Sequence, residues 1–414
     1  MLSRRLFLKN GAFAMVSLGF APSFLSRTAL AASSGRAKRL IAIFQRGAVD
    51  GLSLVVPHGD AEYYRARPTI AIPRPGAAED AAIDLDRFFG FNPRLRALKP
   101  FWDARALAIV HACGSPDSTR SHFDAQDYME TATPGVKSTS DGWLNRCLQA
   151  KREEAATPFR AVAVSSQLPR MLQGTAPSLA LHQVDQFGIH AGQASDKVSA
   201  LFERAYGISP NAQLNVTGRE AFEAIRMLQS ADPARYQPEY GADYPRTPFG
   251  QALKQIAQLA KADVGLEIAF ADVGGWDTHV NQGAGQGVLA TRFDDFGRAI
   301  AALVTDMGDR MADTVVLTMS EFGRAVNENG NRGTDHGHGN AMMVIGGNVR
   351  GGRVHGKWPG LAGASRYEGR DLAVTTDFRD VFAEVVVRHL GVADARSIFP
   401  GYAVNAGRFP GLFA

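Results

Sequence analysis

Residues 39–51 read Arg-Leu-Ile-Ala-Ile-Phe-Gln-Arg-Gly-Ala-Val-Asp-Gly, and this stretch indicates the fold class. A short apolar run that does not alternate with polar residues is typical of a strand buried on both faces of a parallel sheet. The glycines and the aspartate that follow the run favour a tight turn. The sequence therefore predicts a buried strand whose carboxyl end carries Arg46 and Asp50.

The same kind of run recurs along the chain, at residues 107–111, 161–164, 266–271, 314–318 and 342–345. Helix-like stretches lie between or after these runs, at residues 248–262, 292–307 and 377–390. In the last stretch Asp377 is expected as the N-cap and Gly391 as the residue after the helix. This alternation predicts an α/β fold with a mainly parallel central sheet flanked by helices.

Residues 183–244 differ from the rest because they are polar and rich in helix-forming residues, with prolines at positions 233 and 238. We expect this segment to be a helical insertion or cap over the sheet. On this interpretation residues 32–414 form a single domain.

The amino terminus carries the features of an export signal. Ser3-Arg4-Arg5-Leu6-Phe7-Leu8-Lys9 precedes a mildly apolar run over residues 11–25 and the small-residue site Ala29-Leu30-Ala31. Residues 1–31 are therefore expected to be a twin-arginine signal peptide, with the Tat translocase as the export partner. The run is shorter than the about 20 apolar residues that spanning requires, so stable membrane insertion is not expected. The expected location is the periplasm or the extracellular space.

The charge of the chain gives no support to a nucleic-acid partner. The sequence has 45 basic and 41 acidic residues, and residues 1–31 hold four of the basic ones and no acid, which leaves 45 − 4 = 41 basic residues against 41 acidic ones. No stripe of Lys and Arg with interleaved aromatics is present, so nucleic acid is not expected as a partner.

Cysteine usage disfavours sulfur chemistry. Cys113 and Cys147 are the two cysteines, and they are equally compatible with a disulfide or with two buried thiols. Neither lies in a Cys-x-x-Cys motif, so a thiolate zinc site or an exported redox enzyme has no support.

Residues able to bind metals follow the predicted strands in several separate loops. They are Asp50, Asp277, His279, Glu321, Asp335, His336 and His338. Carboxylates and imidazoles without thiolates suit a divalent metal, which we expect to be Zn, Mn, Mg or Ca. Alone, Asp50 or Asp277 is explained better by an ordinary turn, whereas the group Asp-His-Gly-His-Gly at residues 335–339 is a stronger sign of a metal site.

Other residues in these loops are candidates for catalysis. Ser121 is either a nucleophile activated by a metal or the N-cap of a helix that begins at His122. A Ser-His-Asp arrangement is disfavoured because adjacent residues point apart and no Gly-x-Ser-x-Gly elbow is present. Arg46, Arg120 and Arg324 are placed either to bind a substrate anion or to hold the carboxylates of the metal site, and we take Arg46 and Arg324 as catalytic.

Several of these motifs together resemble an exported bacterial family called domain of unknown function 1501. The resemblance rests on the Tat-like signal and on residues 46–51, 121–126, 277–279, 320–324, 333–339, 351–356 and 376–380. That family in turn is similar to the alkaline phosphatase and sulfatase superfamily. The resemblance implies that Asp50 is a ligand after the first strand, that Ser121 is the nucleophile, that Asp277 and His279 form one metal pair and that the other ligands are Glu321, Asp335, His336 and His338.

The chain also departs from the superfamily pattern. Ser121 lies further from Asp50 than the nucleophile usually does, Phe322 stands where a metal histidine is expected, and Asp277 and His279 are closer in sequence than the usual pair. The alternatives are one metal, another arrangement of metals, or loss of hydrolysis. The resemblance thus implies a metal-dependent hydrolase acting on a small anionic ester, such as a phosphate or sulfate ester, or on a glycan. The alternative is a non-catalytic periplasmic binding module with a hydrolase-like fold.

Overall fold

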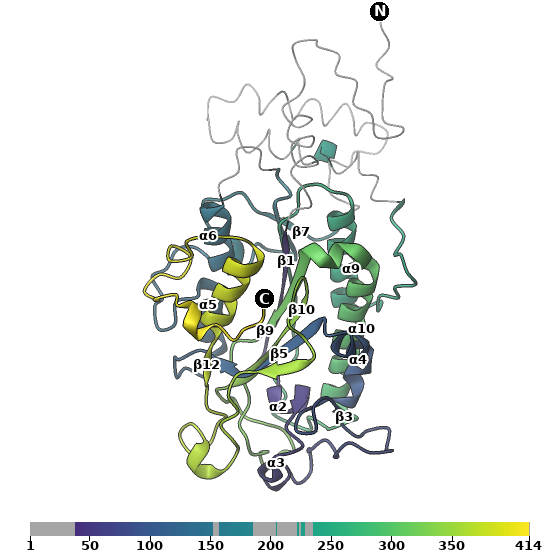
Figure 1. Ribbon diagram of the computed structural model, residues 1–414, viewed down its shortest axis with the longest axis vertical. Helices are drawn as coiled ribbons and strands as arrows, with labels where there is room; N and C mark the ends of the chain where they lie inside the picture. Colours follow the sequence, from purple (N-terminus) through teal and green to yellow (C-terminus); the bar gives the residue numbers. More distant parts are fainter. Residues whose placement is uncertain are drawn as a thin grey trace, which may run out of the picture.

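A large mixed sheet forms the centre of the molecule. The computed structural model describes residues 38–151, 157–184, 204, 222, 225–227 and 235–413. Within this part the strands follow the order β11-β5-β10-β9-β1-β8-β6-β7, and β12 pairs with β5 (Figure 1). Their bounds are β1 Arg39–Gln45, β5 Leu107–Gly114, β6 Ala161–Val164, β7 Leu179–Leu181, β8 Ile268–Val273, β9 Thr314–Met319, β10 Asn340–Gly346, β11 Arg353–His355 and β12 Thr376–Asp377.

Most strand pairs are parallel. β1 lies between β8 and β9, with Leu40 opposite Ile268 on one side and Val315 on the other. β10 is antiparallel to both of its neighbours, β9 and β5. The carboxyl ends of β1, β5, β8 and β9 therefore lie along the same edge as the amino end of β10, and the loops at these ends meet.

Helices cover both faces of the sheet (Figure 1). The helices α4 Lys99–Asp103, α9 Pro248–Lys261 and α10 Val288–Met307 lie on one side, and α5 His122–Thr131 and α6 Trp143–Ala150 lie on the other. Side chains of β1 alternate between the two layers. Ile41 and Ile43 pack in the cluster that contains Phe293, whereas Leu40 and Phe44 pack in the cluster that contains the α6 and α11 side chains.

The smaller elements complete the described part of the chain. A three-stranded antiparallel sheet has the order β2-β4-β3. The bounds are β2 Val55–Val56, β3 Ile83–Asp84, β4 Gly90–Phe91, α2 Gly51–Leu54, α3 Ala61–Ala66, α11 Phe378–Glu384, the 3-10 helices η1 Pro93–Leu98, η2 Arg170–Leu172, η5 Gly308–Asp313, η6 Gly363–Ser365 and η8 Ala406–Arg408, and the π-helical turn η7 Val385–His389.

The predicted α/β fold with a mainly parallel sheet is confirmed. All six predicted strands are present, although the antiparallel direction of β10 was not predicted. The predicted helix over residues 377–390 is capped by Asp377, which accepts from Arg379 N, but it changes to a π-helical turn at Val385. The predicted signal over residues 1–31 and most of the predicted insertion over residues 183–244 lie outside the described residues.

Two further features concern the cysteines and the membrane. Cys113 and Cys147 are buried free thiols, and burial raises the pKa of Cys147 to about 12. Among the helices in the described ranges, none combines the length and the apolar character needed to cross a bilayer.

Candidate metal centre

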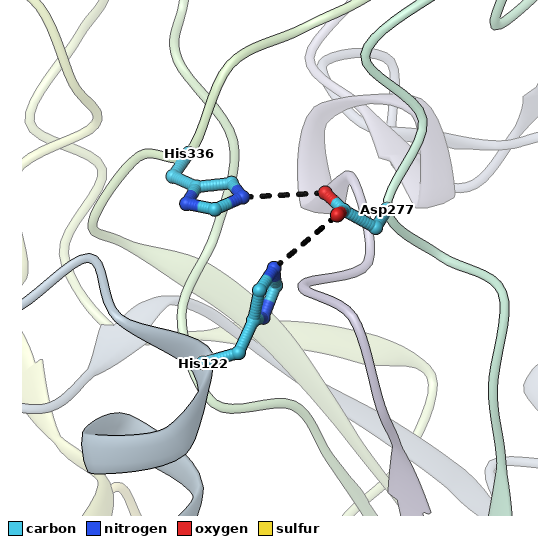
Figure 2. Close-up of side chains that lie close together, drawn as sticks. All are labelled: His122, Asp277 and His336. Atoms are coloured by element: carbon cyan, nitrogen blue, oxygen red, sulfur yellow. Dashed lines mark hydrogen bonds and ion pairs between the residues drawn. The ribbon is translucent and has the colours of Figure 1, made fainter.

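Three side chains meet at close range at the edge of the sheet where β1, β5, β8 and β9 end. His122, Asp277 and His336 have ligand atoms that all lie within 4.8 Å of one another (Figure 2). They come from α5, from the loop after β8 and from the loop before β10. Ligands of open α/β sheets bind at this kind of edge, beyond the carboxyl ends of the strands.

His122 is the first residue of α5, and two neighbours fix its ring. Nδ1 lies 2.8 Å from Glu321 Oε1, and the ring stacks on Phe322 with the centroids 5.0 Å apart. Because a carboxylate only accepts, Nδ1 carries the proton, and Nε2 has a free lone pair when the ring is neutral. This Nε2 is buried, has no hydrogen-bond partner in the described part of the chain and lies 3.5 Å from Asp277 Oδ2. The hydrogen bond with Glu321 raises the pKa of His122, and burial opposes this effect.

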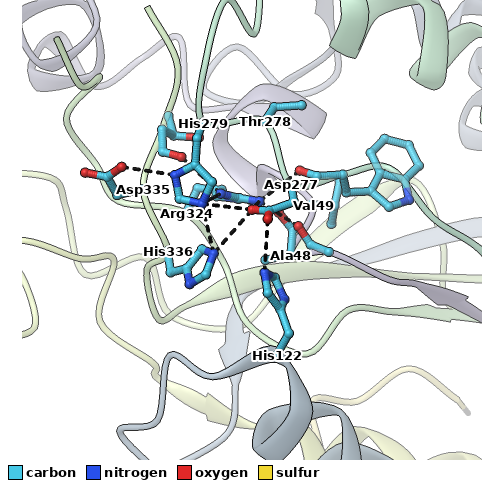
Figure 3. Close-up of polar contacts among 12 residues, drawn as sticks. Ala48, Val49, His122, Asp277, Thr278, His279, Arg324, Asp335 and His336 are labelled. Atoms are coloured by element: carbon cyan, nitrogen blue, oxygen red, sulfur yellow. Dashed lines mark hydrogen bonds and ion pairs between the residues drawn. The ribbon is translucent and has the colours of Figure 1, made fainter. Parts of the chain in front are cut away.

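Asp277 lies just beyond β8 and is contacted from three directions (Figure 3). Its Oδ1 accepts from Arg324 Nη2 at 2.6 Å and lies 2.9 Å from His279 Nε2 and 3.2 Å from His336 Nε2. Burial opposes the negative charge, but the hydrogen bond and the charge of Arg324 prevail and lower the pKa of Asp277 to about 2. The side chain is 45% exposed, so this carboxylate is ionised and open to solvent.

His336 and His279 also point a ring nitrogen toward Asp277, each from a different side (Figure 3). His336 donates from Nδ1 to the main-chain oxygen of Arg120 at 2.8 Å, and His279 Nδ1 lies 3.1 Å from Asp335 Oδ1. Both partners are acceptors, so Nε2 of each neutral ring carries a lone pair. These two Nε2 atoms are 3.0 Å apart. Burial lowers the pKa of His336 more than the Arg120 carbonyl raises it, which favours the neutral ring.

These donors fit a metal ion. His122, Asp277 and His336 offer two imidazole lone pairs and one carboxylate, and His279 Nε2 lies beside them. Neighbouring lone pairs and a carboxylate repel one another, and a cation bound between them would relieve that repulsion. The unpartnered buried Nε2 of His122 is the kind of group that calls for an explanation in a folded protein, and a role as a metal ligand supplies one. Imidazole-rich sets suit zinc and related transition metals, whereas Ca²⁺ and Mg²⁺ prefer oxygen ligands.

Glu321, expected as a ligand, lies behind His122 and orients its ring. Its carboxylate has no exposed surface and also accepts from Gly47 N at 2.8 Å, from Gln126 Nε2 at 2.9 Å and from Ser320 Oγ at 2.9 Å. Burial opposes its charge, but the hydrogen bonds outweigh burial and keep the pKa of Glu321 below its usual value. A carboxylate in this position sets the tautomer and direction of a metal-binding histidine.

Asp50 lies in a buried ion pair and not in the cluster. Arg67 donates to both of its oxygens, at 2.6 Å and 3.0 Å, while Ser53 Oγ and Gln282 Nε2 each donate to Oδ2 at 2.7 Å. Burial opposes the charge of Asp50, but Arg67 and the hydrogen bonds prevail and lower its pKa. The carboxylate is thus fully engaged by the protein.

The two arginines predicted to be catalytic are engaged in the same way. Arg324 is 1% exposed, binds Asp277 and donates to four main-chain oxygens, those of Gly47, Ala48, Trp276 and Thr334. It therefore holds a carboxylate of the site, which is one of the two alternatives that the sequence leaves open. Arg46 donates from Nε to Asp272 at 2.6 Å and from Nη1 to Gln126 and Glu130 at 2.9 Å.

Ser121 and His338 do not join the cluster, and Asp335 joins it indirectly. Ser121 is the exposed N-cap of α5, where its Oγ accepts from Asp124 N at 3.5 Å. His338 stacks on Tyr367 with the centroids 4.2 Å apart. Asp335 holds His279, as described above.

His122 is the functional residue that the sequence analysis missed as a ligand. The signal was present, because His122 follows Ser121 in one of the motifs that carry the family resemblance. The sequence analysis assigned the functional role in this motif to the Ser121 hydroxyl. The fold shows that the His122 imidazole points into the cluster, while the Ser121 hydroxyl caps the helix.

The chain is similar to a protein family and to proteins of known structure. The model of a family described as a protein of unknown function (DUF1501) matches residues 108–397. The crystal structure of the PsFucS1 sulfatase from Pseudoalteromonas sp. has 13% sequence identity and a TM-score of 0.40, and the match covers 94% of this chain and 75% of that chain. No curated protein sequence matches the chain.

Proposed function

The chain belongs to the DUF1501 family, since the family model covers residues 108–397, and we propose from its site that it is a metal-dependent hydrolase. The observation that carries the proposal is the convergence of His122 Nε2, Asp277 and His336 on one point, with the His122 nitrogen unpartnered among the described residues. Three protein ligands beside solvent are typical of a catalytic metal site, because a structural site closes all of its positions with side chains.

The metal would supply Lewis acidity and lower the pKa of a water molecule. The protein's own residues orient the ligands, balance charge and transfer a proton. Glu321 fixes His122, and Arg324 balances the charge of Asp277. His279 is 38% exposed and is held by Asp335, so its Nε2 is placed to take a proton from an attacking water. We expect zinc, or another metal that prefers imidazole, in place of Ca²⁺ or Mg²⁺.

We propose a phosphate or sulfate ester as the substrate class. This part of the proposal rests on the family resemblance stated above. Because Ser121 caps α5, we propose that the nucleophile is water and that Ser121→Ala retains activity. If Ser121→Ala abolishes turnover while the metal content stays normal, the serine is the nucleophile.

The first experiment is metal analysis of the purified protein before and after incubation with Zn²⁺. We expect about one metal ion per chain, and its loss in His122→Ala and His336→Ala. The matched control is His182→Ala, an exposed histidine outside the cluster. Absence of stoichiometric metal after incubation would overturn the proposal.

The second experiment assigns roles within the site with a panel of phosphate and sulfate esters. His279→Gln should lower kcat by about 10²–10⁴-fold, as loss of a general base does, and should leave the metal content unchanged. Loss of metal in this variant would instead identify His279 as a ligand.

A non-catalytic binding module is the second candidate, and one observation favours it. Ser121, the nucleophile of the superfamily pattern, is used as a helix cap. On this hypothesis Asp335→Ala and His336→Ala leave the cellular phenotype unchanged, whereas the hydrolase proposal requires both variants to lose it.

We further propose export of the folded protein by the Tat route, from the features of residues 1–31. A site built from distant loops forms only after folding, so folded export would allow the metal to be loaded before translocation. Replacing Arg4 and Arg5 with lysine should retain the protein in the cytoplasm, which cell fractionation measures.

A further inference from the structure

A second feature at the same edge of the sheet is a cavity of about 850 Å³. It lies beyond the carboxyl ends of β1, β6, β7 and β8, and the amino end of α9 forms part of its wall. Since the strand order is β9-β1-β8-β6-β7, this cavity is next to the loops that carry the metal centre. Its volume is in the range of small-molecule sites.

The cavity is lined by both polar and apolar side chains and carries more positive than negative groups. Arg46, Arg170 and Arg246 line it, and among the described lining residues Asp272 is the one acid. Amide and hydroxyl side chains fill much of the remaining wall, among them Ser166, Gln167 and Gln183. The guanidinium, amide and hydroxyl groups favour a hydroxyl-rich ligand with negative charge.

Some of these groups are occupied and others are free to bind. Arg170 is held by Asp127, and two nitrogens of Arg46 are taken up, Nε by Asp272 and Nη1 by Gln126 and Glu130. In contrast, neither Arg46 Nη2 nor the guanidinium of Arg246 has a hydrogen-bond or ion-pair partner among the residues that the structure describes. Arg246 is also exposed, so its five N–H groups can serve a ligand.

The cavity is connected to the metal centre through three hydrogen bonds. Arg46 Nη1 donates to Gln126 at 2.9 Å, Gln126 donates to Glu321 at 2.9 Å, and Glu321 accepts from His122 at 2.8 Å. A molecule seated against Arg46 would therefore lie beside the residues that orient the His122 ligand.

We propose that this cavity is the subsite for the alcohol portion of the substrate, and that it takes an anionic sugar of monosaccharide size. Planar guanidinium groups pair with a carboxylate through two parallel hydrogen bonds, and the amides and hydroxyls of the wall suit sugar hydroxyls. As a substrate subsite the cavity rests on the proposed hydrolase function, but its binding of a sugar acid is measured without any turnover.

The test is calorimetric titration of the chelator-treated protein with glucuronate and with glucose. We expect glucuronate to bind at least about tenfold more tightly than glucose, the difference that one charge-assisted interaction provides. Arg246→Gln should remove this preference. The matched control is Arg298→Gln, an exposed arginine that pairs with Asp243 and is absent from the cavity wall, and it should retain the preference.

A variant that fills the cavity tests whether the sugars bind there. Ser166→Trp places a large side chain on the wall and should abolish binding of both sugars without a change in circular dichroism. Equal binding of the two sugars, no binding of either, or unchanged binding in Arg246→Gln and Ser166→Trp would overturn the proposal. Because the titration omits the metal, such a result leaves the hydrolase proposal intact, and absence of metal from the protein leaves the binding of a sugar acid to the cavity intact.

Discussion

At the scale of single residues, the histidines of the candidate metal centre have their tautomers fixed in the same way. Each has Nδ1 facing an acceptor: Glu321 for His122, Asp335 for His279 and a main-chain carbonyl for His336. The lone pair of each neutral ring is thereby directed at Asp277. The tautomers are set before any metal binds, which reduces the reorganisation that binding requires.

The variant Glu321→Gln tests whether the acceptor at Nδ1 sets the tautomer of His122. An amide can turn its N–H₂ toward His122 Nδ1, which reverses the tautomer and removes the lone pair from Nε2. We expect metal affinity to fall about 10–100-fold, measured by competition with a chromophoric chelator. Gln126→Ala removes a neighbour of Glu321 but keeps the carboxylate, and it should have a smaller effect. Equal affinity of wild type and Glu321→Gln would contradict the assigned role.

His111 gives the protein a pH dependence that is independent of the metal centre. In β5 its Nε2 lies 3.0 Å from Val55 O, and its Nδ1 accepts from Ala112 N at 2.9 Å, so the ring has no place for a second proton. Burial lowers its pKa to about 4, and the hydrogen bond to Val55 opposes the shift. The unfolded chain, with a histidine pKa near 6.5, therefore binds more protons between about pH 4 and pH 6.5.

The contribution of the neutral His111 to the free energy of unfolding should accordingly be fully present above about pH 6.5 and be lost as the pH decreases from about 6.5 to about 4. We expect this residue to contribute a loss of about 2 kcal/mol in the free energy of unfolding between pH 8 and pH 5. Urea denaturation at several pH values measures it. The His111→Asn variant should be less stable at pH 8 and show a shallower slope, whereas the exposed His182→Asn should keep the slope. If the free energy of unfolding changes with pH equally in His111→Asn and wild type, His111 is not the origin of the pH dependence.

At the scale of elements, the loops after the strands are tied to one another by buried arginines. Arg67, which follows α3, donates to Asp50 after β1 and to the main-chain oxygens of Ala325 and Val326 after β9. Arg324 likewise joins the loops after β1, β8 and β9. These contacts hold together loops that are separated in sequence by hundreds of residues.

Arg67→Met should destabilise the protein by about 3–5 kcal/mol, because it leaves the Asp50 carboxylate buried without its partner. The double variant Asp50→Asn with Arg67→Met should lose less than the sum of the two single variants, since the unpaired charge is gone. Urea unfolding of the four proteins measures the coupling. Additive losses would show that the pair does not interact as its geometry indicates.

The sequence predicted the elements better than it predicted the site. Short apolar runs such as residues 39–44 and 314–318 identify buried strands because burial on both faces permits few other residues. The direction of β10 was not predictable, since a run of four apolar residues is the same in either direction. The roles of Asp50 and Glu321 were not predictable either, because a partner such as Arg67 or His122 is chosen by the fold and not by spacing.

At the scale of the whole molecule, the candidate metal centre joins distant parts of one chain. Its three side chains lie at positions 122, 277 and 336, so the site exists only in the folded state. Anything that binds the folded state alone stabilises it by mass action.

Zinc should therefore raise the unfolding temperature of the chelator-treated protein. At a free concentration of about 100 times Kd the expected stabilisation is about 2.7 kcal/mol. Differential scanning calorimetry measures the shift, and His336→Ala should abolish it while His182→Ala should not. A shift of equal size in His336→Ala would place the bound metal elsewhere.

The pairing of β1 also has a consequence during synthesis on the ribosome. Among the described strands β1 pairs with β8 and β9 alone, and its nearest partner in sequence, Ile268 opposite Leu40, is 268 − 40 = 228 residues away. At about 5–20 residues per second, an apolar strand waits for tens of seconds before a neighbouring strand emerges. We therefore expect the nascent chain to depend on a holding chaperone over this interval. Ribosome-bound chains that end before residue 268 should be more sensitive to protease than chains that extend beyond β9.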